Sequence, residues 1–204
     1  MLDSQEGGHV LRTVGQRAQR GMTLIEVMVT VAILAILVSL ASPAIGDWLL
    51  NAQIRTAAEA LQNGLMQART EAVRRNAPVE FVLGAGSTWT ISLAVGHTAL
   101  ESRQSSEGSQ QVVLAVEPAG ATTVTFDGMG RRWGDPATGK NLDAGKTAQL
   151  SRICVDLPAA VLPAARTRNL ELDISLSGEV RMCDPEVSSA TDNRYCVGYP
   201  TSCT

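Results

Sequence analysis

One carboxylate interrupts a long apolar stretch near the amino end of the chain. Among the twenty residues from Met22 to Ala41, only Glu26 has an ionisable side chain. A helix of this length spans about 30 Å, which matches the hydrocarbon core of a bilayer. A carboxylate at such a depth costs about 2.5–3.5 kcal/mol on insertion scales, so it indicates a specific partner. The stretch supplies none, so the partner must be a new amino terminus, a neighbouring subunit or a proton.

The other residues that could do chemistry argue against catalysis. His9 and His97 are the only histidines, and the sequence contains neither HExxH nor GxSxG. Gly139, Gly145 and Lys146 imitate part of a phosphate-binding loop, but the glycines are one residue too far apart. A predicted strand also follows them, where such a loop needs the start of a helix. The sequence therefore predicts a protein that is not an enzyme and has no cofactor.

Four cysteines lie in the carboxyl-terminal half of the chain: Cys154, Cys183, Cys196 and Cys203. None has CxxC spacing and no histidine lies near them, so no metal site is predicted. An even number of cysteines in an oxidising compartment indicates two disulfides, for which three connectivities exist. We favour Cys154 with Cys183, which would join neighbouring strands, and Cys196 with Cys203, which would close a terminal loop.

A basic and aromatic patch follows the turn at Asp127-Gly128. Trp133 could stack on a base while Arg131, Arg132 and the more distant Arg181 hold phosphates. A partly packed tryptophan beside solvated arginines is the preferred interpretation, and the net charge of −3 disfavours non-specific nucleic-acid binding. A set of oxygen ligands near the carboxyl end matches no defined calcium loop and is expected to be solvated: Asp184, Glu186, Asp192 and Asn193.

One long helix must position these groups. After Pro43, apolar residues recur at spacings of three and four: Ile54, Ala58, Leu61, Leu65, Ala68 and Ala72. Asn76 and Pro78 end this pattern. We therefore predict a helix from about Met22 to about Arg75, bent near Pro43. Its first half is suited to a membrane and its second half to one face of a domain.

Strands follow the helix. The predicted strands are 79–83, 89–93, 111–116, 122–126, 148–155, 170–176 and 179–183. Asp127-Gly128 and Ser177-Gly178 are tight-turn signals, and the polar stretches 101–110 and 131–145 are expected to be loops. One helix followed only by strands predicts an α+β fold, in which the helix packs on an antiparallel sheet or β-sandwich.

The junction Gly21-Met22-Thr23-Leu24-Ile25-Glu26-Val27 resembles the class III signal of type IV prepilins and type II secretion pseudopilins. This resemblance implies that the prepilin peptidase cuts between Gly21 and Met22 and that Met22 is then N-methylated. Glu26 becomes the fifth mature residue, where the family carries a glutamate. Pro43 becomes the twenty-second, where many pilins carry a helix-bending proline. Methionine stands where most members have phenylalanine.

Two later stretches narrow the resemblance. Residues 122–131 and 172–183 are similar to strand-turn motifs of the GspH/FimT minor pilin family. In some members the second motif reads Gly-Arg-x-Arg and contacts DNA. Here it reads Gly178-Glu179-Val180-Arg181, with an acid in place of the first arginine, and this departure disfavours DNA capture. Arg131, Arg132 and Arg181 are the candidate contacts if DNA binds.

The resemblance implies a pilin-like division of the chain. A cleaved leader (1–21) precedes a transmembrane, filament-core helix (22–43), its amphipathic continuation (44–77) and an exported β-rich domain with a disulfide-tied carboxyl end (78–204). The basic excess of the leader predicts a cytoplasmic amino end and a periplasmic domain, in a single pass through a bacterial inner membrane. The residues concerned are Arg12, Arg17 and Arg20.

The implied function is that of a minor pilin or pseudopilin. Such a subunit assembles through its amino-terminal helix and helps to start or tip a type IV pilus or a type II secretion pseudopilus. The implied partners are other pilins, the prepilin peptidase and the inner-membrane assembly platform. The alternative is a tip subunit that binds DNA for uptake in natural transformation.

Two simpler interpretations compete with the prepilin. A secretory signal peptide cut near Ser39-Leu40-Ala41 would place Glu26 at the head of its apolar region. A plain membrane anchor accounts for the length of the stretch but for neither Gly21 nor Glu26. In a prepilin, by contrast, Glu26 can pair with the new terminus of a neighbour. A buried pair of this kind checks register, because a missing partner is costly.

Overall fold

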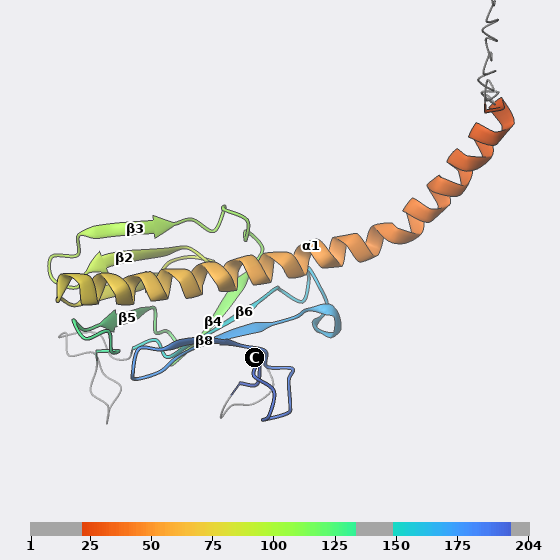
Figure 1. Cartoon of the computed structure of the whole chain (residues 1–204). Helices are drawn as coiled ribbons and strands as arrows, with labels where there is room; N and C mark the ends of the chain where they lie inside the picture. Colours follow the sequence, from red (N-terminus) through yellow and green to blue (C-terminus); the bar gives the residue numbers. More distant parts are fainter. Residues whose placement is uncertain (1–21, 134–148, 197–204) are drawn as a thin grey trace, which may run out of the picture. The chain divides into compact units, whose positions relative to one another are not determined.

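The computed structural model describes residues 22–133 and 149–196 (Figure 1). The chain divides into two compact units, Met1–Ser42 and Pro43–Thr204. One helix, α1 (Leu24–Arg75), gives its first part to the former unit and the remainder to the latter. The predicted helix is therefore observed as one element, which ends at the predicted residue.

The described part of the amino-terminal unit is helical, and its side chains are exposed. Thr23 caps the helix, because its hydroxyl oxygen accepts the Glu26 N–H at 3.3 Å. Every side chain from Met22 to Leu40 is exposed. No single helix of the described residues has the length and apolarity to cross a membrane. The segments Leu24–Leu40 and Ala44–Arg75 reach that standard only as a bent pair.

The carboxyl end of α1 is closed by a left-handed residue. Asn76 has φ 49°, its N–H bonds to the Val73 carbonyl, and the Ala77 N–H bonds back to the Ala72 carbonyl. This pair of bonds is the Schellman arrangement, which satisfies carbonyls that the helix leaves open. Pro78 follows and cannot continue the helix, so Asn76 and Pro78 act as predicted.

The second half of α1 provides one wall of the core. Seven of its side chains are fully buried: Ile54, Ala57, Ala58, Leu61, Leu65, Ala68 and Ala72. They join one apolar cluster with Phe81 and Phe126 on one group of strands and with Ile153 and Leu172 on another. The apolar stripe predicted from spacing is thus the buried face.

Two four-stranded antiparallel sheets follow (Figure 1). The first has the order β3-β2-β1-β5 and contains β1 (Val79–Leu83), β2 (Trp89–Leu93), β3 (Ala99–Arg103) and β5 (Thr123–Phe126). The second has the order β4-β6-β7-β8 and contains β4 (Val113–Glu117), β6 (Arg152–Asp156), β7 (Leu170–Ile174) and β8 (Val180–Cys183). A short 3-10 helix, η1 (Ala164–Arg166), lies between β6 and β7. The α+β prediction is confirmed.

Strand β3 was not predicted, and the loop expected over 101–110 is wrong at its start. Glu101 and Arg103 belong to this strand, which pairs only with β2 at the edge of its sheet. An edge strand needs no continuous apolar face, and charged residues there discourage unwanted pairing. Its composition therefore resembles that of a loop.

A polar clasp ties α1 to the segment around η1. The Asp47 carboxylate accepts a hydrogen bond from Arg166 at 2.8 Å. Asn51 bridges two backbone groups, because its amide donates to the Arg166 carbonyl at 3.0 Å and its oxygen accepts the Arg168 N–H at 2.8 Å. These contacts hold the helix to its own unit shortly after Pro43.

Candidate functional site

The predicted processing and assembly residues lie in the amino-terminal helix or directly before it in the sequence. Gly21 lies outside the described residues, whereas Met22 precedes the helix and is 77% exposed. Glu26 stands in the first turn of α1, and Pro43 lies within the helix. The site is therefore an exposed apolar rod with one carboxylate near its start. Carboxylates are favoured there because the first turn leaves backbone N–H groups open.

The predicted DNA contacts all have partners inside the protein. Arg131 pairs with Asp127 at 3.2 Å, in the turn after β5. Arg132 donates to the Ile174 carbonyl at 2.9 Å, and Arg181 on β8 donates to the Asn193 carbonyl at 2.7 Å. These contacts attach Arg132 to the end of β7 and Arg181 to the segment after β8. Their contact with DNA stays a prediction.

The two turns singled out in the sequence meet in the structure. Gly130 and Gly178 have φ 76° and 79°, in the left-handed region that favours glycine. A Cβ atom on Gly178 would lie 2.0 Å from the Gly130 carbonyl oxygen. Arg69 of α1 donates to this same oxygen at 2.8 Å. Arg69 was missed because the sequence shows it only as one more polar residue of an amphipathic helix.

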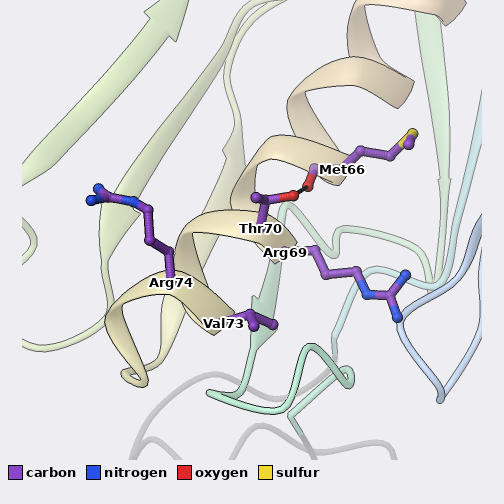
Figure 2. Close-up of a pocket in the computed structure, with 5 residues that line it drawn as sticks. All are labelled: Met66, Arg69, Thr70, Val73 and Arg74. Atoms are coloured by element: carbon purple, nitrogen blue, oxygen red, sulfur yellow. Dashed lines mark hydrogen bonds between the residues drawn. The ribbon is translucent and has the colours of Figure 1, made fainter.

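A shallow hollow of about 430 Å³ lies on the outer side of α1 near its end (Figure 2). The residues that line it are Met66, Arg69, Thr70, Val73 and Arg74. Met66 and Val73 are each 51% exposed, and Figure 2 shows Arg69 and Arg74 pointing to opposite sides of the helix. None of the five described lining residues is an acid, a histidine or a cysteine. The hollow therefore offers contact surface rather than a catalytic set.

Ion pairs fix the end of the helix beside this hollow. The Glu71 carboxylate bonds to Arg74 at 2.6 Å and to Arg75 at 2.8 Å. These hydrogen bonds from the two guanidinium groups lower the pKa of Glu71 to about 2. The positive charges also suit the carboxyl end of a helix, where the backbone dipole is negative.

The predicted disulfide pairing is wrong. Cys183 is bonded to Cys196, with the two Cα atoms 5.2 Å apart, so neither Cys154–Cys183 nor Cys196–Cys203 exists. In the second sheet β7 lies between the strands of Cys154 and Cys183, and its Glu171 is the register partner of both. Two strand spacings of about 4.8 Å exceed the span of a disulfide. Cys154 is itself disulfide-bonded, and Cys203 lies outside the described residues.

A buried ion pair occupies the face of the sheet that carries these cysteines. The Arg152 guanidinium lies 2.6 Å from the Glu171 carboxylate and 3.1 Å from that of Glu117. Arg152 and Glu171 are 6% and 5% exposed. Burial raises the pKa of Glu171, and the positive charge of Arg152 opposes that rise. Glu171 was not singled out in the sequence, where it is only one polar residue of the predicted strand 170–176.

The remaining candidates are structural or lie outside the described residues. His97 is an exposed residue whose ring lies 3.4 Å from the buried Glu80 carboxylate. The Asp184 carboxylate accepts the Glu186 N–H, and Asp192 pairs with Arg194 at 2.9 Å, so these oxygens serve a local turn. The predicted 131–145 loop is described only as far as residue 133, so Gly139, Gly145 and Lys146 lie outside the described residues.

Comparison with known proteins identifies the family. Residues 57–178 match the type II transport protein GspH, and residues 16–42 match the prokaryotic N-terminal methylation motif. The chain belongs to the GspH family, and the two matches together make it a minor pilin or pseudopilin. The family is structural, and the methylation motif implies prepilin processing and assembly with other pilins.

Two solved structures resemble the chain at low sequence identity. Both are of the type IV minor pilin FimU of Pseudomonas aeruginosa strain PAO1. The first crystal form is 16% identical with a TM-score of 0.42, over 64% of this chain and 88% of that one. The second is 18% identical with a TM-score of 0.41, over 63% and 90%. No curated protein matches the chain.

Proposed function

We propose that this chain is made as a prepilin, cut between Gly21 and Met22 and methylated at Met22. It then assembles through α1 into a type IV pilus or a type II secretion pseudopilus, where it acts in initiation or at the tip. The observation that carries the proposal is the continuous exposure of the apolar side chains from Met22 to Leu40. An apolar surface of this extent needs a cover, and a bilayer followed by the helices of other subunits provides one.

Glu26 sets the axial register of this helix relative to the helices of neighbouring subunits. Cleavage creates an amine at Met22, four residues before the carboxylate. In a bundle of helices the amine of one subunit meets the carboxylate of another in a low dielectric. A buried pair adds little net stability, but a misplaced subunit leaves a buried charge unpaired, which costs several kcal/mol of free energy. Correctly aligned subunits are therefore selected.

The exported domain presents the contacts that differ between subunits. The basic leader residues favour a cytoplasmic amino end, and the Cys183–Cys196 disulfide suits a periplasmic location. The role is structural and needs no catalysis or cofactor. The expected partners are other pilins, the prepilin peptidase and the assembly platform of the inner membrane.

The test combines the mature mass with crosslinking inside the cell. Mass spectrometry of the purified chain is expected to show loss of residues 1–21 and gain of one methyl group. Cleavage after Ala41, or an intact leader, would instead support the secretory or anchor interpretation and overturn the proposal.

A photoreactive residue in place of Leu34, which is 60% exposed, reports the neighbours of the helix. Adducts with pilus subunits place the chain in a type IV pilus, and adducts with pseudopilins place it in a secretion system. The matched control carries Glu26→Ala as well and is expected to lose these adducts. Equal adducts in both backgrounds would contradict the role of Glu26.

A further inference from the structure

A buried carboxylate lies against a disulfide in the second sheet. A Glu171 carboxyl oxygen and the sulfur atoms of Cys183 and Cys196 all lie within 4.8 Å of one another. The three residues are 4–6% exposed. The two sulfurs are bonded to each other, so they are not thiolates available to a metal ion. The carboxylate therefore lies beside a disulfide rather than beside a pair of metal-binding thiolates.

The described charged side chains around Glu171 give this site a net negative charge. Among the described residues, Glu117 on β4 and Asp173 on β7 are nearby acids, and Arg152 on β6 is the base that pairs with Glu171. Arg181 on β8 is the register partner of Asp173 but donates to the backbone of the segment after β8. Within this described set, negative charge exceeds positive charge around the carboxylate.

Disulfides are reduced by thiolates. A thiolate attacks one sulfur, a new S–S bond forms as the old one breaks, and the displaced cysteine leaves as a thiolate. A second thiol molecule then releases the other cysteine, so one small-molecule disulfide forms and the protein gains two thiols after protonation. Negative charge spreads over three sulfur atoms in each step, and a nearby carboxylate opposes it.

We propose that Glu171 is a guard residue for the Cys183–Cys196 disulfide, which it protects electrostatically against attack by thiolates. The same position separates the two sets of bonded sulfurs, because Glu171 stands between Cys154 and Cys183 in the strand register. A thiolate released at one of these cysteines must pass the carboxylate to attack at the other. Glu171 thereby also preserves the pairing of the cysteines.

The test measures reduction of Cys183–Cys196 in the full-length protein, by alkylation and peptide mapping under native conditions. With 2-mercaptoethanol, Glu171→Gln is expected to speed reduction about tenfold, since a full charge near the reacting sulfurs is removed. Cysteamine carries an ammonium group that offsets its thiolate, so the acceleration with cysteamine is expected to be smaller. A change that merely opens the structure would speed both reagents equally, and that result would overturn the proposal.

Two further variants separate charge from packing. Glu117→Gln removes the other carboxylate bonded to Arg152, but from β4, which two strands separate from β8, and is expected to leave the rate near that of the wild type. Glu171→Asp keeps the charge and is expected to restore slow reduction. Equal acceleration in Glu117→Gln, or no protection in Glu171→Asp, would contradict a guard role even if Glu171→Gln folds poorly.

Discussion

The two halves of α1 are built for different surroundings. From Met22 to Leu40 apolar side chains point to every side and all are exposed, whereas from Ile54 to Ala72 they form one stripe that is fully buried. The second half finds its cover within its own chain, against two sheets. The first half depends on a bilayer or on other subunits for its cover. One continuous helix thus passes from intermolecular to intramolecular packing.

The largest effect is expected from removing Glu26, the ionisable residue of the first half of α1. Glu26→Ala is expected to leave cleavage and methylation intact but to lower incorporation into filaments by at least about 100-fold, since an unpaired buried charge costs about 3–5 kcal/mol. The measurement is the ratio of sheared-filament to membrane-bound protein, with the mature mass checked alongside. Glu59→Ala, which removes an exposed acid paired with Arg55 on the second half, is the control. Normal incorporation of Glu26→Ala would disprove the register role.

Equivalent truncations in the two halves are expected to differ in their effect on domain stability. Leu61 is fully buried, so Leu61→Ala should lower the free energy of unfolding by about 2–5 kcal/mol. Leu34→Ala removes the same atoms from an exposed site and should change it by less than about 0.5 kcal/mol. Urea titration in detergent, followed by circular dichroism, measures both. Similar losses in the two variants would mean that the first half is packed on the domain.

Alanine substitutions at two glycines in the second half of α1 are expected to change stability in opposite directions. A Cβ atom at Gly64 would lie 2.8 Å from the Trp89 ring and 2.9 Å from that of Phe81, so Gly64→Ala should destabilise the domain by about 1–3 kcal/mol. Gly46 has no atom within 4 Å of that position, so Gly46→Ala should stabilise the helix by about 0.5–1 kcal/mol. Thermal unfolding measures both, and a stabilising Gly64→Ala would disprove the close packing.

The smallest effect is expected at the end of the second half. Because its pKa is about 2 in the folded protein against an ordinary 4.5, Glu71 contributes stability that is complete above pH 4.5 and is lost as the pH falls through 2. Glu71→Gln should therefore flatten the pH dependence of unfolding between these values. Since the pairs are at the surface, about 1 M salt should shrink the difference. An unchanged pH profile would mean that the pairs with Arg74 and Arg75 do not persist in solution.

Local signals made the helix predictable. The apolar spacing identified the buried stripe, and Asn76 with Pro78 marked the end because they act on the backbone beside them. Turn residues likewise located the Ser177-Gly178 hairpin between β7 and β8. The family resemblance added the role of the amino-terminal motif, which local physics alone did not name.

Features that depend on strand order were not predictable. The cysteine pairing failed because the hairpin signal places β7 beside β8, whereas no local signal decides on which side of that hairpin β6 pairs. Glu171 was missed because it lies close to Cys196, which is 25 residues away in the sequence (196 minus 171), and no local pattern indicates such a contact. The contact of Arg69 with the Gly130 carbonyl joins a helix to a turn 61 residues away, and no local pattern encodes such a distance.

The clasp of Asp47 and Asn51 with the segment 166–168 has a mechanical meaning. In the proposed assembly, a pull on the amino-terminal helix reaches the folded unit along α1. The load arrives first where the helix is fastened, which is at the carboxylate of Asp47 and the two-sided bridge made by Asn51. These bonds share tension before any apolar contact of the core has to slide. The clasp is therefore the anchoring point at which the folded unit resists tension along its own helix.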